Sequence, residues 1–229
     1  MSAASSLARR NTRIVLFITV VATAALALAA GSLHAKSASS STTTVSSIEP
    51  SNAWLGKLKA KHRQFFDNPN PNGGIALVHV LNYYDTYNKA FGVKDADVKA
   101  VLTFYGATTF YALNDAMWSK YKLGEFLDTT DPATGKPATA NPWRSAPVIL
   151  GLTLPSASIE SLSKRGATLI LCNNALGIFA GLLAQKRGLE TNAVYEDLKA
   201  NILPGIDLVP GMVIAVEQAQ RAGLTYHRQ

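Results

Sequence analysis

The single cysteine of the chain, Cys172, is the residue whose type and placement best suit chemistry. It ends an apolar run at 167–172 and is followed by Asn173 and Asn174, either of which can cap a helix. This pattern predicts a buried strand that ends at Cys172, directly before a helix N-terminus. Ligands of open α/β sheets bind at that edge, and the helix dipole favours a thiolate there. We therefore predict a nucleophilic Cys172, with Asn173 and Asn174 as ligand-binding groups beside it.

A second interpretation of Cys172 stays open, because free cysteine is among the most buried residue types. In that case the side chain packs as a small hydrophobic residue and takes no part in chemistry. A lone cysteine forms no internal disulfide, and the absence of a second cysteine argues against a dithiol oxidoreductase of the thioredoxin kind.

Two further residues, His79 and Asn114, are candidate ligand-binding groups. His79 interrupts an apolar stretch, where it either binds a ligand or is buried with a hydrogen-bond partner. Asn114 lies among aromatic residues in a stretch expected to be helical, facing a cleft or solvent. The histidines and the cysteine lack the spacing of metal ligands, so we predict no metal site. Gly177 and Gly181 indicate close helix packing rather than a phosphate loop, and no cofactor is predicted.

The carboxyl-terminal third of the sequence resembles the DsrE-like proteins, sulfur-relay relatives with an α/β fold. The resemblance rests on Cys172-Asn-Asn, on Ile-Leu-Pro-Gly-Ile-Asp-Leu-Val-Pro-Gly at 202–211 and on Ala-Gly-Leu-Thr-Tyr at 222–226. It implies that Cys172 carries sulfane sulfur as a persulfide, with a small-molecule sulfur donor or a sulfur-acceptor protein as partner. It also implies a homo-oligomer of three or six subunits. Asn173 departs from the family's commoner Cys-Gly pattern, which leaves the exposure of the thiol open.

The elements that must position Cys172 follow from alternating strand and helix patterns. These patterns predict a single three-layer α/β domain with a mostly parallel sheet of about five strands and helices on both faces. Before the cysteine-bearing strand, the predicted elements are a surface helix at 54–66, a strand at 75–82, a short helix at 83–91, a strand at 98–105 and a helix at 108–121.

Residues 128–147 form a Pro-rich insertion in this domain, with four prolines and a glycine that rule out a helix or a central strand. A loop of this length in a compact domain is usually functional or disordered. Trp143 and Arg144 within it indicate docking against the domain. We expect the insertion to cover a ligand site or an oligomer seam, with Trp143 near the seam.

The beginning of the chain, residues 1–35, is predicted to be an export signal. Arg9 and Arg10 precede an apolar run, and a site of small residues ends at Ala35. The residues after Arg10 fit the twin-arginine pattern poorly, so the Sec route is favoured. An uncleaved anchor is the alternative, because the apolar run is about the minimum length of a spanning helix.

The remainder of the chain is divided into a Ser/Thr-rich linker at 36–51 and the α/β domain at 52–229. With the signal removed, we expect a periplasmic protein that does not contact the membrane. The net charge of +7 includes the arginines of the signal, and the other basic residues are mostly scattered. This pattern argues against nucleic acid as a partner, because such binding needs a basic stripe with interleaved aromatic residues.

The aromatic residues of the domain give a further reason to expect a homo-oligomer, trimeric or hexameric, because several lie in loops or short helices that one sheet cannot easily cover. Aromatic residues left at a surface tend to mark interfaces. The alternative is that the insertion and the 54–66 helix fold back and bury them within one subunit. Two functions therefore remain: an exported protein that relays sulfane sulfur on Cys172, or a non-catalytic oligomeric binding or assembly module in which Cys172 is structural.

Overall fold

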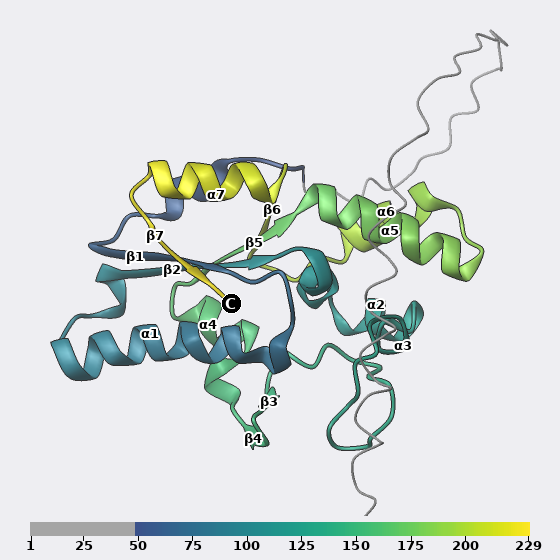
Figure 1. Ribbon diagram of the computed structural model, residues 1–229, viewed down its shortest axis with the longest axis horizontal. Coiled ribbons are helices and arrows are strands. Elements are labelled where there is room, and N and C mark those ends of the chain that lie inside the picture. The colour runs from purple at the N-terminus through teal and green to yellow at the C-terminus, as the bar shows by residue number, and fades with distance from the viewer. Residues whose placement is uncertain (1–48) are drawn as a thin grey trace, which may run out of the picture. The chain divides into compact units, whose positions relative to one another are not determined.

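A five-stranded sheet forms the centre of the computed structural model, which describes residues 49–229 (Figure 1). The strand order is β6-β5-β2-β1-β7, and every neighbouring pair is parallel. The predicted fold class, an α/β domain with a mostly parallel sheet of about five strands, is confirmed. The predicted export signal at 1–35 and residues 36–48 of the predicted linker lie outside the described residues.

The sheet is buried on both faces, as parallel sheets are. Its strands are β1 (His62–Asp67), β2 (Val98–Phe104), β5 (Thr168–Cys172), β6 (Ile206–Val209) and β7 (Thr225–Arg228). All five residues of β5 are buried. Because neighbouring residues of a strand point to opposite faces, Leu171 and Ile170 belong to two separate hydrophobic cores.

Helices cover the two faces of the sheet unequally (Figure 1). One face carries α1 (Ile75–Phe91) and α4 (Ile159–Lys164), and the other carries α7 (Met212–Arg221) with the short 3-10 helix Ala53–Lys57. The helices α5 (Asn173–Arg187) and α6 (Thr191–Ala200) pack together beyond the carboxyl end of β5. The remaining short elements are α2 (Asp115–Lys120), α3 (Leu123–Leu127) and the two antiparallel strands β3 (Val148–Ile149) and β4 (Leu152–Thr153).

The predicted strand at 75–82 is wrong, because these residues are the first half of α1. Gly73 and Gly74, with φ of 64° and 85°, turn the chain into the helix without a side-chain cap. The buried residues then recur with a helical period: Ala76, Leu77, Val80 and Tyr84. The expected helix end at Gly92 is confirmed, since Gly92 adopts the left-handed conformation that ends α1.

The predicted helix at 54–66 is also wrong over its second half, where the chain forms strand β1. Phe65 and Phe66 are both fully buried, one in each hydrophobic core. Two adjacent aromatic side chains can be buried on opposite sides only by a strand that is covered on both faces. β1 lies inside the sheet between β2 and β7, which explains why it needs this coverage.

Arg165, at the end of α4, ties α4 to α1 through charged contacts. It donates to Asp85 at 2.6 Å and to Asp95 at 3.0 Å. We expect Arg165→Ala to lower the free energy of unfolding, measured by urea denaturation, by about 1–2 kcal/mol, because Asp95 loses its cation and Asp85 keeps only Lys89. The control is Arg221→Ala, which removes a surface ion pair with Glu217 and should cost below about 0.5 kcal/mol. Equal losses would contradict this role of Arg165.

The same contacts predict a loss of stability in acid. Lys89 and Arg165 lower the pKa of Asp85, and Arg165 lowers the pKa of Asp95. A carboxylate with a depressed pKa stabilises the fold above its unfolded pKa of about 4, and this stabilisation is lost as pH falls through the folded value. We expect the urea midpoint to fall as the pH is lowered below about 4, and to fall less in Arg165→Ala. If the urea midpoints of the wild-type protein and Arg165→Ala fall equally with pH, Arg165 is not the cause of the acid sensitivity.

Candidate functional site

Cys172 ends strand β5 directly before α5, as the sequence predicts, but the N-cap residue is Cys172 itself rather than Asn173 or Asn174. Its Sγ accepts hydrogen bonds from two backbone N–H groups. One belongs to Ala175 in the first turn of α5, at 3.4 Å, and the other to Met212, the first residue of α7, at 3.3 Å. The N-termini of two helices therefore converge on one sulfur atom. Partial positive charge from both helix ends favours an anion at this position.

The pairing of β5 with β6 brings the two helix ends together. Cys172 is level with Val209, the last residue of β6, so the chain leaves both strands at the same edge. Pro210 and Gly211 then lead into α7. A Cβ on Gly211 would lie 3.2 Å from Asn174 Nδ2, so glycine leaves room for the close approach of the two helix ends. Sequence spacing could not reveal the Met212 contact, because it depends on which strands are neighbours.

The thiol is covered by apolar side chains, and Cys172 is only 5% exposed. It belongs to the hydrophobic core on the α7 face of the sheet, together with Ile170, Val209 and Met212. Sγ thus lies against apolar side chains and two backbone N–H groups. The site therefore combines a strong anion-binding geometry with low access for large reagents.

Asn173 and Asn174 lie directly beside the cysteine at the start of α5. Asn173 is half-buried and its Oδ1 accepts a hydrogen bond from the Tyr195 hydroxyl of α6 at 2.6 Å. Asn174 is exposed. With Gly177, Ile178 and Tyr195 they line an open groove of about 590 Å³. Tyr195 was not among the predicted site residues, because its approach depends on the packing of α6 against α5.

A second polar group that the sequence analysis missed lies along the same edge of the sheet. Leu171 pairs with Phe104, so Tyr105 follows β2 at the level of Cys172. The Tyr105 hydroxyl donates to Asp67 at 2.7 Å, and the Tyr226 hydroxyl donates to the other oxygen of the same carboxylate at 2.5 Å. The pKa of both tyrosines is raised, mainly by burial and secondly by the hydrogen bond to the Asp67 carboxylate. Both hydroxyls are therefore protonated donors at neutral pH.

His79 and Asn114 are not brought to Cys172. His79 lies on α1 rather than on a strand, where its Nδ1 is 2.6 Å from Gln229 Oε1 and its ring stacks on His227. Asn114 precedes α2, so its predicted place within a helix is wrong. Its Oδ1 caps the helix by accepting from the Met117 N–H at 3.2 Å. Both side chains therefore have structural partners.

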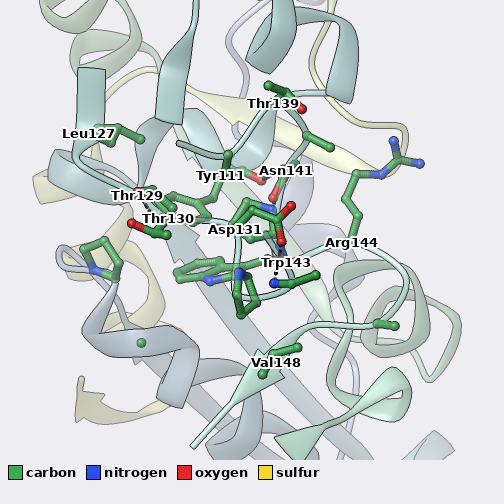
Figure 2. Close-up of a pocket in the computed structure, with 18 of the residues that line it drawn as sticks. Tyr111, Leu127, Thr129, Thr130, Asp131, Thr139, Asn141, Trp143, Arg144 and Val148 are labelled. Atoms are coloured by element: carbon green, nitrogen blue, oxygen red, sulfur yellow. Dashed lines mark hydrogen bonds between the residues drawn. The ribbon is translucent and has the colours of Figure 1, made fainter. Parts of the chain in front are cut away.

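The insertion at 128–147 is irregular, as predicted, and folds back onto the domain. Trp143 is only 4% exposed and packs on Tyr111, with ring centroids 4.0 Å apart. The expectation that Trp143 lies at a surface seam is therefore wrong. Most of the aromatic residues that suggested an interface are buried within one subunit, which removes the compositional reason for an oligomer. The insertion instead lines a half-open cavity of about 610 Å³ (Figure 2).

Among residues 49–229, no three side chains of His, Cys, Asp or Glu are grouped so that they could hold a metal ion. Over the same residues, no helix combines the length and the apolar character that crossing a bilayer requires.

Comparison with known proteins assigns no activity to this α/β domain. No protein-family model matches the chain, and no curated protein sequence matches it. Among solved structures, the chain is similar to a protein of unknown function, MTH1491, from Methanobacterium thermoautotrophicum. The two share 13% sequence identity with a TM-score of 0.36, over 75% of this chain and 100% of the other.

Proposed function

We propose that this chain is an exported, DsrE-like sulfur-handling protein in which Cys172 takes up sulfane sulfur as a persulfide and passes it to a partner. The observation that carries the proposal is the convergence of the α5 and α7 N-termini on Cys172 Sγ. A persulfide carrier needs an anionic sulfur before and after loading, and backbone N–H groups at helix ends stabilise such an anion.

The proposed reaction is a transfer of one sulfur atom. The Cys172 thiolate attacks the sulfane sulfur of a donor such as thiosulfate, and a new S–S bond forms while the S–S bond of the donor breaks. Sulfite leaves with the electron pair, and Cys172 becomes a persulfide anion. A thiolate of an acceptor protein then attacks the outer sulfur and releases the Cys172 thiolate. Both steps are thiol–disulfide-type exchanges, which depend on thiolate character and access.

Three further features support this function. The cysteine lies at the carboxyl edge of a parallel sheet, where α/β proteins place their ligands. The open groove formed by Asn173, Asn174 and Tyr195 lies next to it and offers an approach for an acceptor. The motifs at 202–211 and 222–226 resemble those of DsrE-like proteins, and they form β6, the entry to α7, and the start of β7. Export to the periplasm by the Sec route is part of the same proposal.

The test is mass spectrometry of the intact protein after exposure to thiosulfate or polysulfide. We expect a gain of one or more sulfur atoms that is reversed by dithiothreitol and is absent in Cys172→Ser. Labelling of the denatured protein with iodoacetamide controls for a thiol that was oxidised beforehand. An unmodified mass in a protein whose denatured thiol still labels fully would reject the persulfide function.

The alternative function is a non-catalytic oligomeric binding or assembly module in which Cys172 is structural. The burial of the thiol among Ile170, Val209 and Met212 favours it. In that case the native thiol resists alkylation, Cys172→Ala causes only a loss of packing, and light scattering gives the mass of a trimer or hexamer. A single-chain mass at micromolar concentration would reject the assembly role and leave the persulfide role untouched.

A further inference from the structure

We propose that the half-open cavity lined by the insertion binds a small molecule with an α-ammonium group beside a carbonyl or carboxylate oxygen, as in a free amino acid or a peptide N-terminus. The ammonium group binds Asp131, and the oxygen accepts a hydrogen bond from the indole N–H of Trp143. This site is separate from Cys172 and does not rest on the persulfide function.

The cavity has the size and lining of a small-molecule site. Its volume of about 610 Å³ falls within the range of about 300–1,000 Å³ typical of ligand pockets. Leu127 and Val148 supply apolar surface, Trp143 and Tyr111 supply aromatic surface, and Asp131 supplies a carboxylate. Figure 2 shows these side chains gathered around one opening, drawn from the insertion and from the elements on either side of it.

The wall of the cavity is held in place without a ligand. The Asn141 amide donates to two backbone carbonyls, of Tyr111 at 2.7 Å and of Leu113 at 2.8 Å. Within the insertion, the Ala138 N–H donates to the Thr129 carbonyl at 2.9 Å. The Asn141 bonds fix one limb of the insertion against the domain, and the Ala138 bond joins the two limbs to each other. A preformed site avoids the entropy cost of ordering a loop when the ligand binds.

The charge of the lining favours a cation. Asp128 and Asp131 line the cavity, and neither forms an ion pair with any residue of 49–229. Arg144, the basic residue of the lining, forms ion pairs with Asp115 at 2.8 Å and with Glu160 at 2.6 Å. Figure 2 shows its guanidinium directed away from Trp143. The lining therefore attracts an ammonium group and disfavours an isolated anion.

Asp131 is a fixed rather than a mobile carboxylate. Its Oδ1 accepts from the Ala133 N–H at 2.9 Å, and its Oδ2 accepts from the Thr134 hydroxyl at 3.1 Å. Each carboxylate oxygen can accept a further hydrogen bond. An ammonium group can therefore be bound at a defined position without breaking the turn at 131–134.

Trp143 supplies the second half of the recognition. It is 96% buried, given its 4% exposure, and its indole N–H has no hydrogen-bond acceptor among the described residues. The Tyr111 hydroxyl is already paired with Thr129 at 3.1 Å. The nitrogen is not closed off from solvent, so a ligand oxygen can replace water as the acceptor of this hydrogen bond. A fixed carboxylate and an unpaired donor in one cavity match the two polar groups of an α-amino acid.

The first test is isothermal titration calorimetry of the purified protein with the twenty amino acids. For the tightest ligand, the analogue without the ammonium group should bind at least about tenfold more weakly, and the amine without the carboxylate about three- to tenfold more weakly. An amide-capped peptide that begins with the same residue distinguishes a peptide N-terminus from a free amino acid. No binding of any amino acid at millimolar concentration, or equal binding of the analogue without the ammonium group, would overturn the proposal.

Two variants test the assigned groups. Asp131→Asn keeps an oxygen for the Ala133 bond and removes the charge, and should weaken binding at least about tenfold. Trp143→Phe keeps a ring and removes the N–H, and should weaken binding about three- to tenfold. Glu217→Gln on α7 lies outside the cavity and should leave binding unchanged. Unchanged affinity in Asp131→Asn overturns the proposal, even if Trp143→Phe fails to fold by circular dichroism.

Discussion

Proline in place of Met212 is expected to slow the reaction of Cys172 with iodoacetamide at neutral pH about tenfold relative to Met212→Ala. Both variants truncate the same buried side chain, but only proline removes the N–H that donates to Cys172 Sγ. A hydrogen bond to a charged group contributes about 1.5 kcal/mol, which corresponds to about a tenfold change in rate. The measurement is the second-order rate of alkylation, followed by mass.

The backbone at this position suits the substitution. Met212 is the first residue of α7, where proline is well tolerated, and Gly211 before it is extended, with ψ of 135°. Matching circular dichroism spectra and urea midpoints for the two variants would show that the helix is intact. Equal alkylation rates would mean that the α7 N–H does not stabilise a reactive thiolate, and would favour the structural role of Cys172.

The part of the fold that the sequence predicts best is the unit from β5 to α5. Local signals define it completely, since Gly166 precedes the apolar strand and Gly188 ends the helix in the left-handed conformation. The position of Cys172 between strand and helix follows from these signals alone. A strand that is buried on both faces gives an uninterrupted apolar run, and its short length and the glycine before it distinguish it from a buried helix.

The amino-terminal part of the domain was harder to predict because its local signals are ambiguous. The segment 75–82 alternates branched and smaller residues, which fits a strand, although helical burial decides the outcome. The segment 62–67 contains charged and polar residues before two phenylalanines, which fits an amphipathic helix. Its place inside the sheet is set by the pairing with β2 and β7. Tertiary contacts of this kind override local propensity.

The candidate site shows the same division between local and tertiary information. The contact of Sγ with the α5 N-terminus is local, and the sequence predicts it. The contact of Sγ with the Met212 N–H depends on strand order. The position of Tyr105 beside Cys172 depends on the register of β2 and β5. Neither strand order nor register can be read from the sequence. Trp143 illustrates the opposite case, because an aromatic residue in a polar loop suggested an interface, whereas its ring is buried against Tyr111 and Phe104 of the domain.

Glycine at position 124 of α3 is expected to be essential for attaching the insertion. A Cβ at Gly124 would overlap the backbone nitrogen and oxygen of Ala138, so neither a rotamer change nor a small shift can relieve the contact. We expect Gly124→Ala to lower the free energy of unfolding by about 2–3 kcal/mol, in the range of overpacked sites.

The matched control for this prediction is Gly177→Ala, in the middle of α5. Nothing lies within 4 Å of a Cβ there, so the predicted close packing of Gly177 is wrong. Alanine at this position should raise the free energy of unfolding by about 0.5–1 kcal/mol through helix propensity. The same substitution should therefore change stability in opposite directions at the two positions, as measured by urea denaturation. A stable Gly124→Ala protein that keeps the native fluorescence of Trp143 would show that the insertion does not depend on this contact.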